Sequence, residues 1–116
     1  MNQKQRKDKR AHLIDYLEIL DQEDGSTIGH LADISPDGIM LSSRKPFAVN
    51  ENISFSLRLP ESFTERTMLN FTGRCLWCKK DVNPDYYMSG FKFCDLRDNE
   101  IKTLKNLINS YGFIRR

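Results

Sequence analysis

The sequence predicts a mainly β protein: a six-stranded antiparallel β-barrel, a C-terminal α-helix packed on it, and a flexible basic N-terminal arm. Apolar and polar side chains alternate in Asn52–Leu59 and Met68–Lys79, as in strands with one buried face. Turn residues separate short apolar runs elsewhere in residues 11–95, and the apolar spacing then changes to three and four. We therefore expect one domain made of an arm (1–10), a barrel (11–95) and a helical segment (96–116).

Six strands are expected in chain order. The first, His12–Leu20, does not alternate cleanly, so a helix is possible there, although a bent strand agrees better with the strands that follow. Thr27–Ile34 and Gly38–Leu41 flank a turn with the sequence Ser-Pro-Asp-Gly, in which proline presets φ. The three consecutive apolar residues at 39–41 are typical of a strand buried on both faces. The remaining strands are Asn52–Leu59, Met68–Lys79 and Tyr86–Cys94.

The last segment, Asp95–Tyr111, has the spacing of an amphipathic helix. Asp98 is the expected N-cap and Gly112 the expected residue after the helix end. The apolar residues of one face are Ile101, Leu104, Leu107, Ile108 and Tyr111.

Composition excludes several classes of protein. The 116 residues are 39% hydrophobic and 29% charged, which is typical of one globular domain. No apolar run is long enough for a membrane span, and the polar N-terminus lacks the apolar core of a secretory signal. Three cysteines do not indicate a disulfide framework, so a cytoplasmic location is expected.

Positive charge is concentrated at the N-terminus. Five Lys and Arg against one Asp give residues 1–10 a charge of +4, while the other 106 residues sum to −2. This arm suits a local anionic partner.

A metal site and a catalytic site are both unsupported by the sequence. Cys75 and Cys78 have the spacing of metal ligands, and Cys94 with His12 or His30 would complete a set. However, residues three apart in an alternating strand point to opposite faces, and the two apolar residues between the cysteines do not suit a zinc knuckle. No nucleophile, zinc-protease or phosphate-loop motif occurs. We expect no metal, no cofactor and no enzymatic activity.

Two short polar motifs indicate ligand binding. Arg6 and Arg10 stand four apart before the first strand; they suit a solvated tail, but guanidinium groups also grip phosphates and stack on purines. Asp33, Ser35 and Gly38 suit a simple β-turn, but a carboxylate also accepts hydrogen bonds from the guanine edge and glycine lets backbone approach a ligand. Each motif alone is weak.

Together, Arg-x-x-x-Arg before the first strand and Asp-x-Ser-x-x-Gly some twenty residues later resemble the two motifs of the PilZ domain. That family is a bacterial receptor module for cyclic di-GMP. The resemblance covers nearly the whole chain, including the barrel, the strand with Trp77, the strand at residues 90–93 and the closing helix.

The resemblance implies a role for each motif residue. The arginines of the arm would hold guanine and phosphate groups, and the second motif would line the barrel side of the site. Some members also place a tryptophan against a guanine; Trp77 is the candidate here, although a tryptophan at an alternating position is more often part of the core. The implied ligand-binding residues are Arg6, Arg10, Asp33, Ser35, Gly38 and Trp77.

The sequence therefore predicts a bacterial second-messenger receptor or adaptor. Cyclic di-GMP would order the arm and so pass a signal to an unidentified downstream protein, in motility or biofilm regulation. One alternative is a PilZ-like scaffold for protein interactions with weak or no ligand binding. Another is a basic-armed binder of single-stranded nucleic acid, which the net negative body disfavours. Neither a membrane nor a nucleic-acid polymer is an expected partner.

Overall fold

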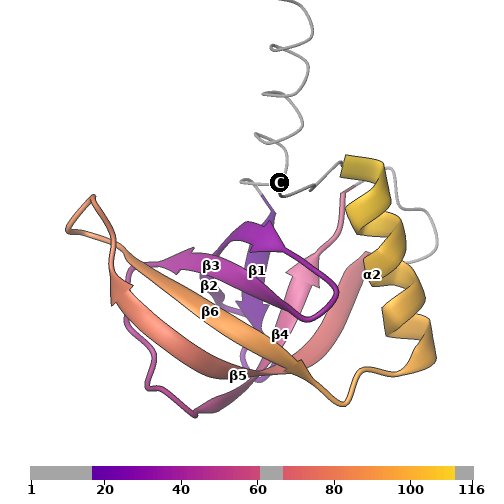
Figure 1. Ribbon diagram of the computed structural model, residues 1–116, viewed down its shortest axis with the longest axis horizontal. Helices are drawn as coiled ribbons and strands as arrows, with labels where there is room; N and C mark the ends of the chain where they lie inside the picture. The colour runs from indigo at the N-terminus through magenta and orange to yellow at the C-terminus, as the bar shows by residue number, and fades with distance from the viewer. Residues whose placement is uncertain (1–16, 61–66, 112–116) are drawn as a thin grey trace, which may run out of the picture.

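Six antiparallel strands and one helix are seen in the computed structural model, which describes residues 17–60 and 67–111 (Figure 1). The mainly β fold class is confirmed. The start of the expected first strand, residues 12–16, lies outside the described residues. The elements are β1 (Glu18–Asp21), β2 (Thr27–Ile34), β3 (Gly38–Ser43), β4 (Asn52–Arg58), β5 (Met68–Lys80), β6 (Tyr87–Cys94) and α2 (Asp98–Tyr111).

The strands close into a barrel in the order β1-β2-β3-β6-β5-β4 (Figure 1). All neighbours are antiparallel, and β4 pairs with β1 to close the ring. Closure gives every strand two partners, so the sheet has no unpaired edge. The turn between β2 and β3 forms where the sequence predicts it, with the Ser35 N–H donating to the Gly38 carbonyl at 2.9 Å.

The core inside the barrel is built from the inward positions of the alternating strands. Phe55 and Leu57 of β4 are completely buried, as their alternation predicts. Phe55 packs edge-to-face on Phe91 of β6, with ring centroids 5.0 Å apart. Phe71 of β5 packs in the same way on Phe93, also at 5.0 Å. This aromatic cluster joins β4, β5 and β6 inside the barrel, and Phe91 of β6 also lines the groove described below.

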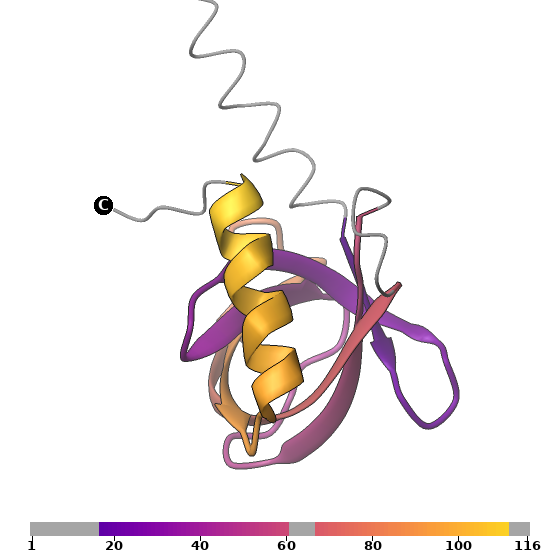
Figure 2. The ribbon, with the colours of Figure 1, turned by 90° about the vertical axis from the view of Figure 1, so that its right-hand side faces the viewer.

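Helix α2 packs against β5 and lies across one end of the barrel (Figure 2). Leu104 and Leu107 are buried and belong to the same hydrophobic core as the strands. Ile108 is partly buried against that core. The predicted helical face is thus the face that packs.

The N-terminal cap of α2 differs from the prediction by one residue. The Ile101 N–H donates to the Arg97 carbonyl at 2.9 Å, which makes Arg97 the capping position and Asp98 the first helical residue. The Glu100 carboxylate accepts from the Arg97 N–H at 2.9 Å, which is one half of a capping box. The expectation of Asp98 as N-cap is therefore wrong, and Gly112 lies outside the described residues.

Two β-bulges change which face of the barrel the following residues occupy. In β2 the pairing with β3 shifts between Leu31 and Asp33, so Ala32 is an extra residue. In β5 the pairing with β6 shifts between Cys75 and Trp77, so Leu76 is extra. After each bulge, the residue that simple alternation would place inward lies on the outer face. Asp33 and Trp77 are the two residues moved in this way.

The β5 bulge corrects two expectations from the sequence. Trp77 does not share the inner face with buried Cys75; it is half-buried on the outside of the barrel. Cys75 pairs with Phe91 and Cys78 with Ser89, two positions on the same inner face of β6, so the two cysteines do not point to opposite faces. The prediction that β3 is buried on both faces is also wrong, because Met40 is only half-buried on the outer face.

Candidate functional site

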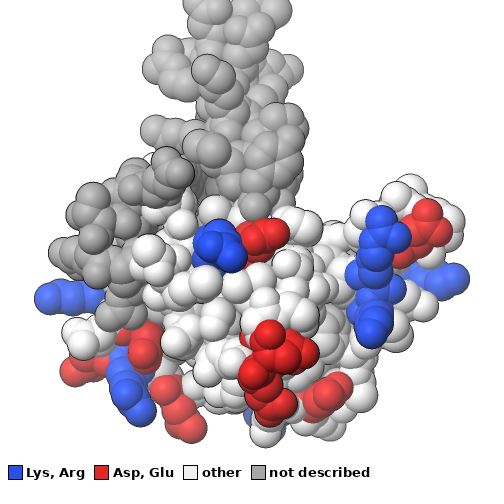
Figure 3. All heavy atoms as spheres, turned by 180° about the vertical axis from the view of Figure 1, so that it is seen from behind, with Lys and Arg blue, Asp and Glu red and all other residues white. Residues whose placement is uncertain are grey.

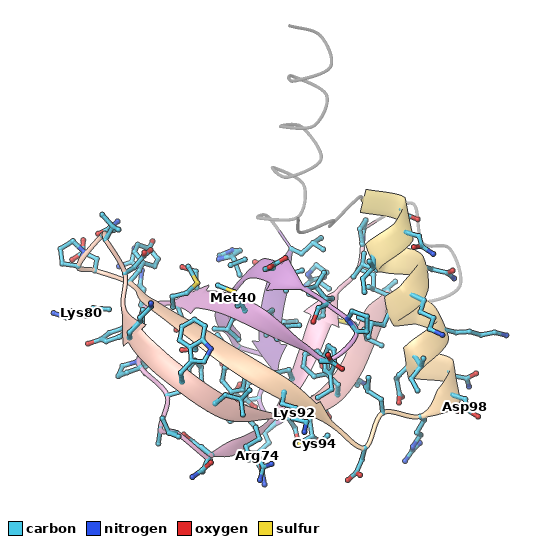
Figure 4. All side chains as sticks on the ribbon, in the orientation of Figure 1. Met40, Arg74, Lys80, Lys92, Cys94 and Asp98 are labelled. Carbon is cyan, nitrogen blue, oxygen red and sulfur yellow. The ribbon has the colours of Figure 1, made fainter. Side chains whose placement is uncertain are left out.

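A row of outward-facing residues crosses four neighbouring strands and brings together, on one surface, the two residues that follow the bulges. Asp33 of β2 pairs with Met40 of β3. Met40 pairs with Gly90 of β6, and Gly90 pairs with Trp77 of β5. We call Asp33, Met40, Gly90 and Trp77 the upper row; Figure 4 labels Met40 on β3. A carboxylate thus stands at one end of the row and an indole at the other.

The Trp77 indole lies directly over Gly90. A Cβ atom built on Gly90 would come within 2.6 Å of Cε2 and 3.0 Å of Cζ2 of that ring, and it would also collide with Nε1. The absent side chain at Gly90 therefore makes the space in which the indole rests. The Lys79 ammonium group stands 5.5 Å from the centre of the same ring, a cation–π distance.

The turn between β2 and β3 holds the other predicted residues. The Ser35 hydroxyl accepts from the Asp37 N–H at 3.3 Å and lies 3.5 Å from the Gly38 carbonyl. The Asp33 carboxylate accepts from the Ile34 N–H at 2.8 Å, which fixes its position at the bulge. These bonds hold the Ser35 hydroxyl and the Asp33 carboxylate against the backbone at the turn.

Gly38 has a structural reason to be glycine. A Cβ on Gly38 would collide with the Phe91 carbonyl oxygen and lie 3.2 Å from the Lys92 Cα. Gly38 pairs with Lys92, so the close approach that glycine permits here is between β3 and β6. Strand pairing alone explains this residue, with or without a ligand.

A groove of about 540 Å³ unites these features on the outside of the barrel. Of the six predicted ligand-binding residues, the groove brings four together; Arg6 and Arg10 lie outside the described residues. The sequence did not single out Leu76, Met40, Gly90 or Lys92 as members of the site, and only the strand register identifies them. The four predicted residues that line the groove are Asp33, Ser35, Gly38 and Trp77.

The chemistry of this groove suits a flat, polar heterocycle that carries negative charge nearby. An indole offers a stacking surface, and a carboxylate accepts paired N–H groups such as those on the guanine edge. Lys92 adds a cation to the wall of the groove. Asp37 lines it as well, so the walls carry both signs of charge.

A second and larger pocket, of about 870 Å³, lies at the strand ends between the β1–β2 and β3–β4 loops. It contains none of the predicted site residues. Its lining carries acidic side chains such as Glu23 and Glu51 beside Arg44 and Lys45.

The cysteines have structural contacts. Burial raises the pKa of the Cys75 thiol, and the nearby Cys78 adds to the increase. The Cys78 sulfur accepts from the Phe47 N–H at 3.4 Å. Within residues 17–60 and 67–111, no three His, Cys, Asp or Glu side chains gather closely enough to hold a metal ion.

No helix in these two ranges is long and apolar enough to cross a membrane.

Comparisons with known proteins agree with the fold described above. The family model described as "PilZ domain" matches residues 4–110. The chain is similar in structure to the inhibitor of motility MotI/DgrA from Bacillus subtilis, with a TM-score of 0.66 and 18% identity over 85% of this chain and 48% of that one. It is also similar to the PilZ domain of YcgR from Escherichia coli, solved with c-di-GMP, with a TM-score of 0.63 and 12% identity over 84% of this chain and 82% of that one. The chain thus spans about half the length of MotI. No curated protein sequence matches it.

Proposed function

Because the chain belongs to the PilZ domain family, we propose that it is a receptor that binds cyclic di-GMP in the groove between the β2–β3 turn and Trp77. The observation that carries this proposal is the meeting of Asp33, Ser35, Gly38 and Trp77 around one groove. Asp33, Ser35 and Gly38 come from β2, the following turn and β3, and Trp77 comes from β5, about forty residues later in the sequence. Two of them reach the outer face only because of a bulge.

The ligand would use the two ends of the upper row differently. One guanine stacks on the Trp77 indole, because base–aromatic stacking needs an exposed flat ring and this ring is half-exposed. The Asp33 carboxylate accepts from the guanine N–H edge. Arg6 and Arg10 of the arm then bind phosphate and guanine groups from the opposite side, an assignment that rests on the sequence motif alone.

The receptor would pass its signal to a downstream protein. Binding brings the arginines of residues 1–10 against the barrel, which changes the surface presented to a partner. One of the structurally similar proteins, MotI/DgrA, is named an inhibitor of motility. We propose a related output for this chain, in motility or biofilm regulation within the cytoplasm. Slower amide exchange in residues 1–10 when ligand is added would support the ordering step, and unchanged exchange would contradict it.

Isothermal titration with cyclic di-GMP, and with GTP as a control ligand, tests the proposal. We expect micromolar or tighter binding of cyclic di-GMP, weakened at least about tenfold in Arg10→Ala and in Asp33→Asn, since one charge-assisted hydrogen bond contributes about 1.5–3 kcal/mol. Asp85→Asn is the matched control, because Asp85 is an exposed carboxylate in the β5–β6 hairpin and lines neither pocket. Equal affinity in all three variants would contradict the site.

The same titration separates the alternatives. A PilZ-like scaffold for protein interactions would give no heat with cyclic di-GMP. A binder of single-stranded nucleic acid would bind oligonucleotides with a steep dependence on salt. On the face opposite to that of Figure 1, acidic and basic side chains are mixed, so that face offers no continuous basic surface among the described residues (Figure 3). A cradle for a nucleic-acid backbone would need a continuous basic surface.

A further inference from the structure

Two basic residues face each other on the outer surface beside the upper row. Arg74 of β5 pairs directly with Lys92 of β6, and both side chains are exposed. Figure 4 labels both residues, which lie close together on adjacent strands. Like charges at directly opposite positions of an antiparallel pair repel each other and destabilise the sheet. The fold alone therefore gives no reason for this pairing.

Within the part of the chain that the structure describes, neither Lys92 nor Arg74 forms an ion pair with a carboxylate. The one ion pair among the described residues joins Arg58 to Glu18, on β4 and β1. The pair of cations is flanked in its own row by Gly38 of β3 and Asn52 of β4, which are uncharged. We call Gly38, Lys92, Arg74 and Asn52 the lower row.

The lower row borders the groove. Lys92 lines it, and Gly38 belongs both to the groove and to the predicted binding motif. Along a strand, successive residues on one face are roughly 7 Å apart, so the lower row lies about that far from the upper row. A nucleotide separates its base from its phosphate by one ribose, which is a comparable distance. The carboxylate and the indole stand in the upper row, and the cations stand in the lower row.

We propose that Lys92 and Arg74 form a phosphate subsite of the groove, which binds one phosphate of the cyclic dinucleotide while its guanine occupies the upper row. This inference rests on the proposed function and adds a contact on the barrel to those of the arm. The bound phosphate places a negative charge between two cations, so the repulsion that weakens the free protein is removed in the complex.

The test compares Lys92→Gln and Arg74→Gln with Lys80→Gln by titration with cyclic di-GMP. Lys80 is an exposed lysine at the end of β5 that lines neither pocket, so its variant controls for the loss of one positive charge. In Figure 4 its label stands at the left, at the hairpin end of β5, away from Lys92. We expect affinity to fall about fivefold in each of the two subsite variants and to change less than about twofold in Lys80→Gln. Lys92→Arg should retain the affinity of the unaltered chain, because the charge is kept.

Thermal unfolding without ligand distinguishes a binding role from a structural one. If the two cations serve binding, then Lys92→Gln and Arg74→Gln leave the melting temperature unchanged or raise it, since each removes repulsion. A lowered melting temperature in both variants, with unchanged affinity, would overturn the inference.

The outcomes also separate this inference from the proposed function. If the unaltered chain does not bind cyclic di-GMP, the proposed function fails and the subsite fails with it. If the unaltered chain binds, and the subsite variants bind as Lys80→Gln does, only the subsite is wrong. Weaker binding in the subsite variants that is also seen in Lys80→Gln would show a general effect of charge, and would likewise overturn the subsite.

Discussion

Replacing Gly90 with alanine is expected to displace the Trp77 indole from the groove and leave the barrel folded. The new Cβ atom would come within 2.6 Å of Cε2 of the indole, a separation that Cβ atoms essentially never show, and within 3.0 Å of Cζ2. The backbone itself accepts alanine, because Gly90 does not have the positive φ seen at Gly25. The ring is half-exposed, so it can rotate outward into solvent. The strain is therefore relieved by moving one side chain.

The expected magnitude follows from the loss of stacking. Base–aromatic stacking contributes about 1–3 kcal/mol per base, so the affinity of Gly90→Ala for cyclic di-GMP should fall by about fivefold to 150-fold. Trp77 is the single tryptophan of the chain, so its fluorescence reports on this ring alone. In the variant without ligand, emission should shift to longer wavelength, as it does when an indole becomes more exposed to water.

A double-mutant cycle provides the control. Trp77→Ala should lose about as much affinity as Gly90→Ala, and the combined variant should lose no more than either, because both changes remove the same contact. If emission shifts in Gly90→Ala while affinity stays that of the unaltered chain, the indole does not contact the ligand. If emission does not shift, the close packing of Gly90 and Trp77 is wrong.

Three further predictions concern the scaffold. Gly38→Ala should lower the free energy of unfolding by about 2 kcal/mol or more in urea titrations, because its Cβ collides with the Phe91 carbonyl; a change below about 0.5 kcal/mol would contradict that contact. Leu107→Ala should cost about 2–5 kcal/mol by the same measurement, since Leu107 is fully buried between α2 and the barrel, and a neutral result would mean that the helix does not pack there. At pH 8 a thiol-specific reagent should modify Cys75 more slowly than Cys94. The reason is that burial raises the pKa of the Cys75 thiol, so its thiolate fraction stays low until the pH exceeds that pKa. Mass spectrometry of single-cysteine variants measures the two rates, and faster modification of Cys75 would contradict the prediction.

Much of the fold could be predicted because the strands have strong local patterns. The alternation of Asn52–Leu59 predicts β4 and its buried face, and the change of period after residue 95 predicts α2. The turn at residues 35–38 carries proline and glycine at the positions that a reversal needs. In each case the local preference and the burial of apolar surface favour the same structure.

The faces of Asp33 and Trp77 could not be predicted, because each depends on a bulge. The extra residues are alanine and leucine, and neither has a backbone preference that marks a bulge in the sequence. A single inserted residue reverses the face of every side chain that follows it. The expectation that Cys75 and Cys78 point apart failed for the same reason.

The sequence motif predicted some residues of the candidate site, but the residues that strand pairing brings beside them could not be predicted. The motif named Asp33, Ser35 and Gly38, and the groove contains all three. Lys92 and Arg74 were not singled out, because a lysine and an arginine eighteen residues apart are ordinary surface residues until the register of β5 and β6 places them opposite each other. Arg6 and Arg10 lie outside the described residues, so their role stays a prediction.

The most direct test of the central claim follows the indole N–H of Trp77 by nuclear magnetic resonance during titration with cyclic di-GMP. With one tryptophan in the chain, this resonance is identified without assigning the spectrum. We expect it to shift and saturate at micromolar ligand, together with the amides of Gly38 and Gly90, and not to respond to GTP. No change at saturating cyclic di-GMP, or changes confined to the pocket that contains Glu51, would contradict the account.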